Sequence, residues 1–233
     1  YKLGYLAYVN GEYRFAINWL NEYHERLKPT AASENFLASC HLRLGEFRNA
    51  LDIYQRIAPR DEVTQWLQRV CSQGRTRQNK DWHGRKTTPM QRLQSLRWRN
   101  DILRDTLKHQ ARTLSEIDTL INSFQYVSDE RLFKEVDYWQ MPSQFEANRR
   151  GDCEDFALWV WIQLLRMNIR ARFFLGGWYH EEINHAWVCI YDRQGVHLLE
   201  CTPQDVNRPI PVRSAYDYVP VLSIDKSLIW YRH

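Results

Sequence analysis

A helical pattern of apolar residues follows directly after the run Gly151-Asp152-Cys153. Its apolar positions share one wide face of a helix: Phe156, Ala157, Val160, Trp161, Leu164 and Leu165. Asp152 is a candidate N-cap, which places Cys153 in the first turn. Unpaired backbone N–H groups and the positive end of the helix dipole lie there, so we expect the pKa of this thiol to be lowered. The alternative is a small buried hydrophobic side chain, the usual role of a cysteine.

Beyond residue 168 the pattern changes from helical to alternating, as in strands. We predict strands over residues 169–175, 184–191 and 196–202, joined by short turns that favour an antiparallel meander. Two further strands are predicted over 218–224 and 228–231. Pro220 favours an edge position for the first of these, because proline cannot donate a hydrogen bond to a sheet. The predicted fold class is therefore α+β, with the Cys153 helix packed on an antiparallel sheet.

His185 and Glu200 lie on neighbouring predicted strands, on either side of one tight turn. If both face the same side of the sheet, they form a hydrogen bond, and the helix brings the Cys153 thiol to them. In such a set the imidazole takes the thiol proton and the carboxylate fixes the imidazole tautomer. His180 and His197 remain alternative candidates for the base.

The first 73 residues carry an internal repeat. Residues 11–16 (GEYRFA) match residues 45–50 (GEFRNA) at an offset of 34 residues, 45 − 11. This period predicts helix–turn–helix pairs that resemble tetratricopeptide repeats, so residues 1–73 are expected to form an all-α repeat segment. Such arrays present a concave surface to a protein partner, and a structural spacer is the alternative. Residues 74–89 are basic and aperiodic, and we interpret them as a linker.

Several short motifs in residues 90–230 resemble those of one family. GDCEDFA (151–157), NHAWV (184–188) and LLECTP (198–203), in this order and spacing, resemble the transglutaminase-like cysteine enzyme superfamily, whose core is papain-like. The stretches DYWQMP (137–142) and RRGDCED (149–155) are similar to the bacterial transglutaminase-like cysteine proteinases. The resemblance implies a transglutaminase-like catalytic domain over residues 90–233.

Carried over by position, the resemblance implies Cys153 as nucleophile, His185 as general base and Glu200 as the orienting acid. The family more often has aspartate at the last position, so the longer glutamate requires an adjusted geometry. Trp139 and Gln140 are expected near the oxyanion, with simple packing as the alternative for Trp139.

Acidic residues flank the cysteine, and some of these proteinases bind calcium through residues at such positions. Asp152 and Glu154 match them, with Asp155 nearby. Carboxylate oxygens suit calcium. Helix capping and complementation of the helix dipole explain the same acids without a metal. We therefore expect chemistry that requires no cofactor, with calcium as the metal that this site would take.

Composition and charge limit the classes of partner. The chain has 233 residues and a net charge of +4, which gives no nucleic-acid footprint. It has no apolar run of membrane-spanning length. The five cysteines are odd in number and lack a C-x-x-C pair, so neither a zinc site nor a disulfide framework is indicated. Free thiols favour a reducing, cytoplasmic compartment over the periplasm.

Three functions are compatible with these patterns. The leading prediction is a cysteine peptidase or related amide hydrolase that acts on a protein or peptide through a thioester. The second is transglutaminase-type acyl transfer, in which an amine captures the same thioester. The third is a non-catalytic interaction module, in which the repeats recruit a partner. The presence of Cys153, His185 and Glu200 together argues against the third.

Overall fold

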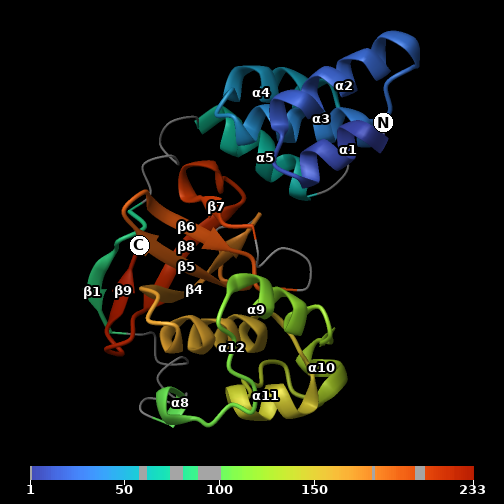
Figure 1. The fold of residues 1–233 in the computed structure, drawn as a ribbon. Coiled ribbons are helices and arrows are strands. Elements are labelled where there is room, and N and C mark those ends of the chain that lie inside the picture. The colour runs from blue at the N-terminus through green and yellow to red at the C-terminus, as the bar shows by residue number, and fades with distance from the viewer. Residues whose placement is uncertain (1, 58–61, 74–80, 89–100, 180–181, 203–207) are drawn as a thin grey trace. The chain divides into compact units, whose positions relative to one another are not determined.

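The structure is a computed structural model that describes residues 2–57, 62–73, 81–88, 101–179, 182–202 and 208–233 (Figure 1). The chain divides into two compact units. One contains Tyr1–Lys80 together with Arg213–Asp217, and the other contains Asp81–Val212 and Tyr218–His233. Within the described residues, no helix combines the length and the apolar character needed to cross a membrane.

The first unit contains successive helices, and each packs against the next: α1 (Lys2–Val9), α2 (Tyr13–Arg26), α3 (Ala31–Arg43), α4 (Phe47–Arg56) and α5 (Glu62–Gln73). The two copies of the repeated sequence have matching backbones, since Gly11 has a φ of 76° and Gly45 a φ of 75°. This left-handed region favours glycine. Ala16 and Ala50 are fully buried, as expected where two helices approach closely. The assignment to the tetratricopeptide family stays a prediction.

Residues 213–217 belong to this helical unit although they lie far along the chain. Arg43, at the end of α3, donates hydrogen bonds from Nη2 to Oδ2 of Asp217 at 2.5 Å and from Nη1 to the Ser214 carbonyl at 2.9 Å. The rings of Phe47 and Tyr216 meet edge to face, with centroids 5.1 Å apart. The side chains of Arg43 and Asp217 are only 11% and 5% exposed, so each charge depends on the other for compensation.

An antiparallel sheet is the centre of the second unit. Its strands are β1 (Arg85–Thr87), β4 (Ala171–Trp178), β5 (His185–Asp192), β6 (Gly195–Leu199), β7 (Ile210–Pro211), β8 (Tyr218–Ile224) and β9 (Trp230–Arg232). They are ordered β1-β9-β8-β4-β5-β6-β7. Helix α12 (Cys153–Arg166) packs on β4 and β5 and lies across one face of the sheet (Figure 1). The predicted mixture of a helix with an antiparallel meander is confirmed.

The described residues also form several smaller elements. They are α8 (Asp101–Arg104), α9 (Leu114–Ile121), α10 (Asp129–Leu132), α11 (Pro142–Asn148), the parallel pair β2 (Gln125–Tyr126) and β3 (Arg150–Gly151), and the 3-10 turn η1 (Val212–Ser214). Helices α9 and α11 pack against α12. Phe124 packs against Phe145 and Trp159, with centroids 5.3 and 5.6 Å away. This aromatic packing fixes the side of α12 that faces away from the sheet.

Both faces of the sheet carry aromatic packing, because successive side chains of β4 point to opposite faces. Phe173 lies on the α12 side, 6.3 Å from Trp161. Phe174 stacks on Trp187 at 5.8 Å on the other side, where Trp82 covers it at 5.8 Å. The strands that carry the candidate site are therefore held from both faces.

Residues 81–88 differ from the predicted linker of 74–89. Trp82 is buried, and β1 forms the edge of the sheet against β9. The strand is short and charged, as edge strands often are, and it has no alternating pattern that would reveal it in the sequence. Residues 74–80 and 89 lie outside the described residues.

The edge position predicted for the strand with Pro220 is wrong. Strand β8 lies between β9 and β4. Pro220 pairs with Gly176, directly after the point where the β4–β8 register shifts between Leu175 and Gly176. Such an irregularity interrupts the hydrogen-bond ladder, which lets an interior strand accommodate a residue without an N–H.

Candidate active site

The start of α12 is fixed by short-range pairing. Strand β3 places Gly151 beside Tyr126 of β2, and the Val127 N–H donates to the Gly151 carbonyl at 2.8 Å. Asp152 occupies the N-cap position with extended dihedrals, but its side chain makes no capping hydrogen bond. Cys153 is therefore the first residue of the helix, as predicted, and its backbone N–H lies among those without a partner inside the helix.

The Cys153 thiol lies among carboxylates. It donates to Oε2 of Glu154 at 3.4 Å, and the backbone N–H of Ala186 approaches its sulfur. Burial raises the pKa of the thiol well above its usual value, and the charges of Glu154 and Asp152 raise it further. The lowered pKa expected from the helix N-terminus is therefore wrong, because the pKa of this thiol is raised. The adjacent acids and burial outweigh the helix dipole.

His185 and Glu200 come together as the predicted strands imply. His185 is the first residue of β5, and Glu200 directly follows the end of β6. The Nε2 N–H of His185 donates to Oε2 of Glu200 at 2.9 Å. Its other ring nitrogen, Nδ1, is left for the thiol. Ala186, whose N–H reaches the Cys153 sulfur, directly follows His185 in the chain. The structure thus joins His185 to Glu200 and places the backbone N–H of the following residue, Ala186, at the Cys153 sulfur.

Glu200 is held by further donors that the sequence did not reveal. The Tyr218 hydroxyl donates to Oε2 at 2.6 Å, and Thr202 donates to Oε1 from its N–H at 3.1 Å and from its hydroxyl at 2.9 Å. Burial opposes ionisation of Glu200, but these bonds and the bond from His185 outweigh it and lower its pKa. Glu200 is therefore an ionised partner that orients the imidazole.

Gln140 has a supporting position rather than a free amide. Its backbone N–H donates to Oδ1 of Asp155 at 2.8 Å. Its side-chain amide donates to Oδ2 of Asp155 at 2.5 Å and to the Arg150 carbonyl at 2.9 Å, and its Oε1 accepts from Asn148 at 2.7 Å. A hydrogen bond from Gln140 to an oxyanion, as predicted, would require its N–H groups to lose their bonds to Asp155 or to the Arg150 carbonyl. Gln140 instead joins the loop before α11 to the first turn of α12.

Trp139 packs beside the sheet. Its ring lies edge-on to Phe173 with centroids 5.7 Å apart, and its indole N–H donates to Asp137 at 2.7 Å. It is among the partly buried side chains that pack against the main core, as is Cys153. The geometry matches the packing alternative stated for this residue.

A group of carboxyls surrounds the predicted calcium residues. Ligand oxygens of Asp129, Asp152, Glu154 and Asp155 all lie within 4.8 Å of one another. Oδ1 of Asp129, Oδ1 of Asp152 and Oε1 of Glu154 are buried without a hydrogen-bond partner. Buried oxygens without donors are costly, and hard oxygen ligands of this kind suit calcium. The residues present therefore fit a calcium ion.

The pKa values of the same carboxyls indicate crowded negative charge. Burial raises the pKa of Asp129 to about 6, with Asp152 adding to the effect. Burial likewise raises the pKa of Asp155 to about 7, although Gln140 donates to it. For Glu154 burial and Asp152 raise the pKa well above its usual value. Asp129 was not predicted as a ligand, because it lies 24 residues before Cys153, 153 − 129, and only the α10–β3 packing brings it close.

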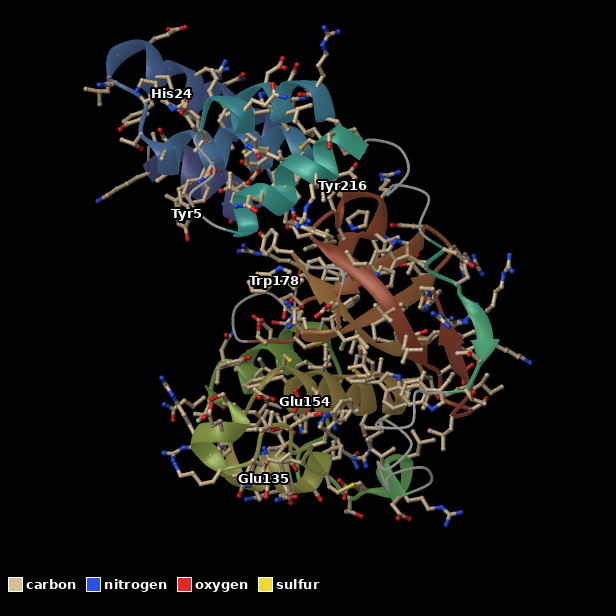
Figure 2. All side chains as sticks on the ribbon, turned by 180° about the vertical axis from the view of Figure 1, so that it is seen from behind. Tyr5, His24, Glu135, Glu154, Trp178 and Tyr216 are labelled. Carbon is tan, nitrogen blue, oxygen red and sulfur yellow. The ribbon has the colours of Figure 1, made fainter. Side chains whose placement is uncertain are left out.

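Two exposed aromatic side chains border the thiol and the imidazole. Tyr126 is 50% exposed, and after burial the charges of Cys153 and Asp152 contribute to raising its pKa. Trp178, at the end of β4, is 45% exposed, and its ring lies 5.5 Å from that of His185. Figure 2 labels Trp178 on its strand and Glu154 on α12. The exposure of these two rings was not predicted from the sequence, since an isolated aromatic residue gives no signal of exposure.

Comparisons with known proteins give only distant likenesses. No family model and no curated protein matches the sequence. EGTA-treated LapG of Legionella pneumophila is 16% identical with a TM-score of 0.42, covering 80% of this chain and 86% of that chain. Calcium-bound LapG of Legionella pneumophila is also 16% identical, with a TM-score of 0.41, covering 78% and 90%. At these values the likeness carries no argument about fold or function.

Proposed function

We propose that this chain is a thiol-dependent amide hydrolase, a cysteine peptidase that uses Cys153, His185 and Glu200. The observation that carries the proposal is the hydrogen bond of 2.9 Å between His185 and an ionised Glu200, together with the N–H of the next residue, Ala186, at the Cys153 sulfur. A base oriented by a carboxylate and placed beside a cysteine is the arrangement that nucleophilic catalysis requires.

The first half of the reaction forms a thioester. Nδ1 of His185 takes the proton of Cys153, and the sulfur attacks the carbonyl carbon of the substrate. The tetrahedral oxyanion accepts a hydrogen bond from the Cys153 backbone N–H at the start of α12. The intermediate then collapses, the carbon–nitrogen bond breaks, and the departing amine takes the proton from His185. Glu200 stabilises the imidazolium while it holds that proton.

Hydrolysis of the thioester restores the enzyme. A water molecule gives a proton to His185 and attacks the thioester carbon. The carbon–sulfur bond breaks, the acid product leaves, and the sulfur recovers the proton from His185.

A polypeptide substrate is supported by the aromatic rings at the site. Tyr126 and Trp178 present exposed faces next to the reacting groups, and such rings bind the side chains of extended peptides with little loss of entropy. A protein partner on the helical unit stays a prediction.

The first test asks whether Cys153 reacts and turns over. Proteome-derived peptides are incubated with the full chain, and new termini are identified by mass spectrometry. We expect new termini with wild type and none with Cys153→Ala or His185→Ala. A primary amine is added in a parallel sample, where transamidated products would indicate acyl transfer. Equal cleavage by wild type and Cys153→Ala would contradict the proposal.

Alkylation provides an internal control in the same protein. We expect iodoacetamide to modify Cys153 faster in wild type than in His185→Ala, because the imidazole accepts the thiol proton. Cys40 and Cys71 serve as references, since both are buried cysteines of the helical unit, to which His185 does not belong. If Cys153 reacts no faster than these two thiols, the three groups do not act together.

Calcium is the metal that the acidic group fits, held by Asp129, Asp152 and Glu154. Its positive charge would compensate the buried carboxylates next to the thiol. We expect calcium at 100 times its Kd to stabilise the protein by about 2.7 kcal/mol, seen as a rise in Tm that EGTA reverses.

Asp129→Asn is expected to remove the rise in Tm that calcium causes. Without calcium, the variant is expected to have a higher Tm than wild type, because the repulsion between carboxylates is reduced. Asp192→Asn in the β5–β6 turn is the control and should keep the calcium response. If calcium does not change the Tm of the wild-type protein, the acidic residues do not bind calcium and have a structural role alone.

A further inference from the structure

A cavity lies at the end of α12 that is opposite to Cys153. It has a volume of about 560 Å³ and is lined by residues that follow α12, by the start of β4 and by the turn between β8 and β9. Sites for small molecules typically occupy about 300–1,000 Å³. Because α12 has 14 residues that each rise 1.5 Å, the cavity lies about 20 Å from the thiol. It is therefore separate from the proposed active site.

Arg172 is the central cation of this cavity. The residue is 8% exposed, and its Nη1 donates to the His83 carbonyl at 2.6 Å. Its guanidinium lies 3.7 Å from the ring centroid of Tyr231 and 5.1 Å from that of Tyr191. No carboxylate in the described part of the chain forms an ion pair with it. Buried charges are usually paired, so this guanidinium lacks the anion that such a place requires.

The other charged residues of the cavity do not supply that anion. Arg170 and Lys226 are exposed and add positive charge. Among the described residues of the lining, Asp225 is the only acid, and its carboxylate already accepts from the N–H groups of Ser227 and Ile229 and from the hydroxyl of Tyr231. Arg170, Arg172 and Lys226 therefore converge at a cavity whose one described carboxylate, that of Asp225, already accepts hydrogen bonds from its own turn and from Tyr231.

The C-terminus of α12 does not account for these cations. A helix C-terminus favours a basic side chain in its last turn, and Arg166 already occupies that place. Arg170 and Arg172 come from the following loop and strand, and Lys226 comes from a turn more than 50 residues later. Residues so distant in sequence converge here because β4 and β8 are neighbours in the sheet.

We propose that this cavity binds a small molecule that carries a phosphate or carboxylate group. The guanidinium of Arg172 would receive the anionic oxygens, since its planar fork matches both groups. Arg170 and Lys226 would contact the ligand at the mouth, and Tyr231 would hold the guanidinium in place. The site does not depend on the proposed hydrolase activity, because none of its residues takes part in that chemistry.

Isothermal titration calorimetry of the full chain tests the proposal. Inorganic pyrophosphate and citrate are titrated separately, in low-salt buffer that has been freed of divalent cations and contains no phosphate. We expect saturable binding with one ligand per chain, weakened by added salt. Binding of pyrophosphate alone identifies a phosphate ligand, and binding of citrate alone identifies a carboxylate ligand. If neither anion binds at millimolar concentration, the proposal is overturned.

Variants locate the binding. Arg170 and Lys226 are exposed, so replacing both with alanine should leave the fold intact. We expect this double variant, Arg170→Ala with Lys226→Ala, to bind the anion about tenfold more weakly, or more weakly still. Arg193→Ala, an exposed arginine in the β5–β6 turn, removes a positive charge elsewhere and should leave the affinity unchanged. Arg172→Lys keeps the charge but loses the fork, so weakened binding is expected there too. Equal affinity in wild type and in the Arg170 and Lys226 double variant would contradict the proposed site.

Discussion

Glu200 shows how much a single carboxylate depends on neighbours that its own motif does not contain. His185 and Glu200 could be predicted together, because a short turn between two strands fixes their spacing. Tyr218 could not, since its hydroxyl reaches Glu200 only after β8 has paired with β4. The direction in which the pKa of the Cys153 thiol is shifted could not be predicted from the sequence either. A helix start suggests a lowered pKa, whereas burial of the sulfur, followed by the charge of Glu154, raises the pKa of the thiol.

Tyr218→Phe tests the role of this neighbour. Loss of a hydrogen bond to an ionised group is expected to cost about 1.5–3 kcal/mol of unfolding free energy at pH 7. Glu200 has a lowered pKa in the folded state, so its contribution is present above its unfolded pKa of about 4.3 and is lost as pH falls through the folded value. The variant raises the folded pKa, so its deficit should be largest near neutral pH and shrink in acid.

Urea unfolding at several pH values measures this deficit. Tyr5→Phe is a suitable control, because Tyr5 is 44% exposed on α1 and has an aromatic contact with Phe36. A deficit of equal size at pH 7 and at acidic pH would mean that Tyr218 acts through packing alone. Peptide turnover provides the second readout, since a misplaced carboxylate should lower kcat more than it changes KM.

At the scale of elements, strand β4 carries the contacts that bring the site together. Gly176 pairs with His185 on one side and with Pro220 on the other. A Cβ at Gly176 would lie 2.1 Å from the Val219 carbonyl oxygen and 2.5 Å from Cη2 of Trp187. The glycine is therefore required by the close approach of two strands and a buried ring, and its position fixes where β5 begins.

Gly176→Ala is expected to destabilise the protein by about 1–3 kcal/mol or more, because the nearby backbone cannot move aside. It should also slow alkylation of Cys153, since His185 shifts with its strand. Gly195→Ala is the matched control: its added Cβ meets nothing within 4 Å, so only the strain of its φ of 129° remains. Thermal unfolding and iodoacetamide labelling measure the two effects. Similar Tm values for both variants would show that the strands can separate at Gly176.

The elements around this strand were predictable to different degrees. The helix of residues 153–166 and the strands near 171–192 have strong periodic patterns, and the sequence places them within a few residues. Strand β1 has only three polar residues, and its pairing with β9 depends on a contact nearly 150 residues away. Pro220 misled the prediction, because the register shift that accommodates it, with Leu175 opposite Leu222 and Gly176 opposite Pro220, arises only when β8 pairs with β4.

At the scale of the whole molecule, the helical unit is built from two distant parts of the chain. The repeat at residues 11–16 and 45–50 predicted its helices, but nothing in the repeat indicates that residues 213–217 complete it. The connection includes the buried ion pair of Arg43 with Asp217, the hydrogen bond from Arg43 to the Ser214 carbonyl and the aromatic contact of Phe47 with Tyr216. A boundary drawn from the sequence near residue 73 therefore separates residues that belong together.

Arg43→Ala is expected to destabilise the helical unit by about 3–5 kcal/mol, because it leaves Asp217 buried without a partner. Arg43→Met combined with Asp217→Leu should recover much of this loss, since neither buried charge remains. Arg26→Ala removes an exposed pair with Glu22 and should change stability by less than about 1 kcal/mol. Circular dichroism during urea unfolding measures all three. An Arg43→Ala variant as stable as Arg26→Ala would show that residues 213–217 contribute nothing to the unit.

The composition of the helical unit has a consequence for the order of synthesis. When residue 80 has left the ribosome, the helices are present but Asp217 has not been made. The remaining 137 residues, 217 − 80, require about 7 to 27 s at 5–20 residues per second. During that interval the Arg43 guanidinium is without its carboxylate. The nascent helical unit therefore lacks residues 213–217 until most of the second unit has been synthesised.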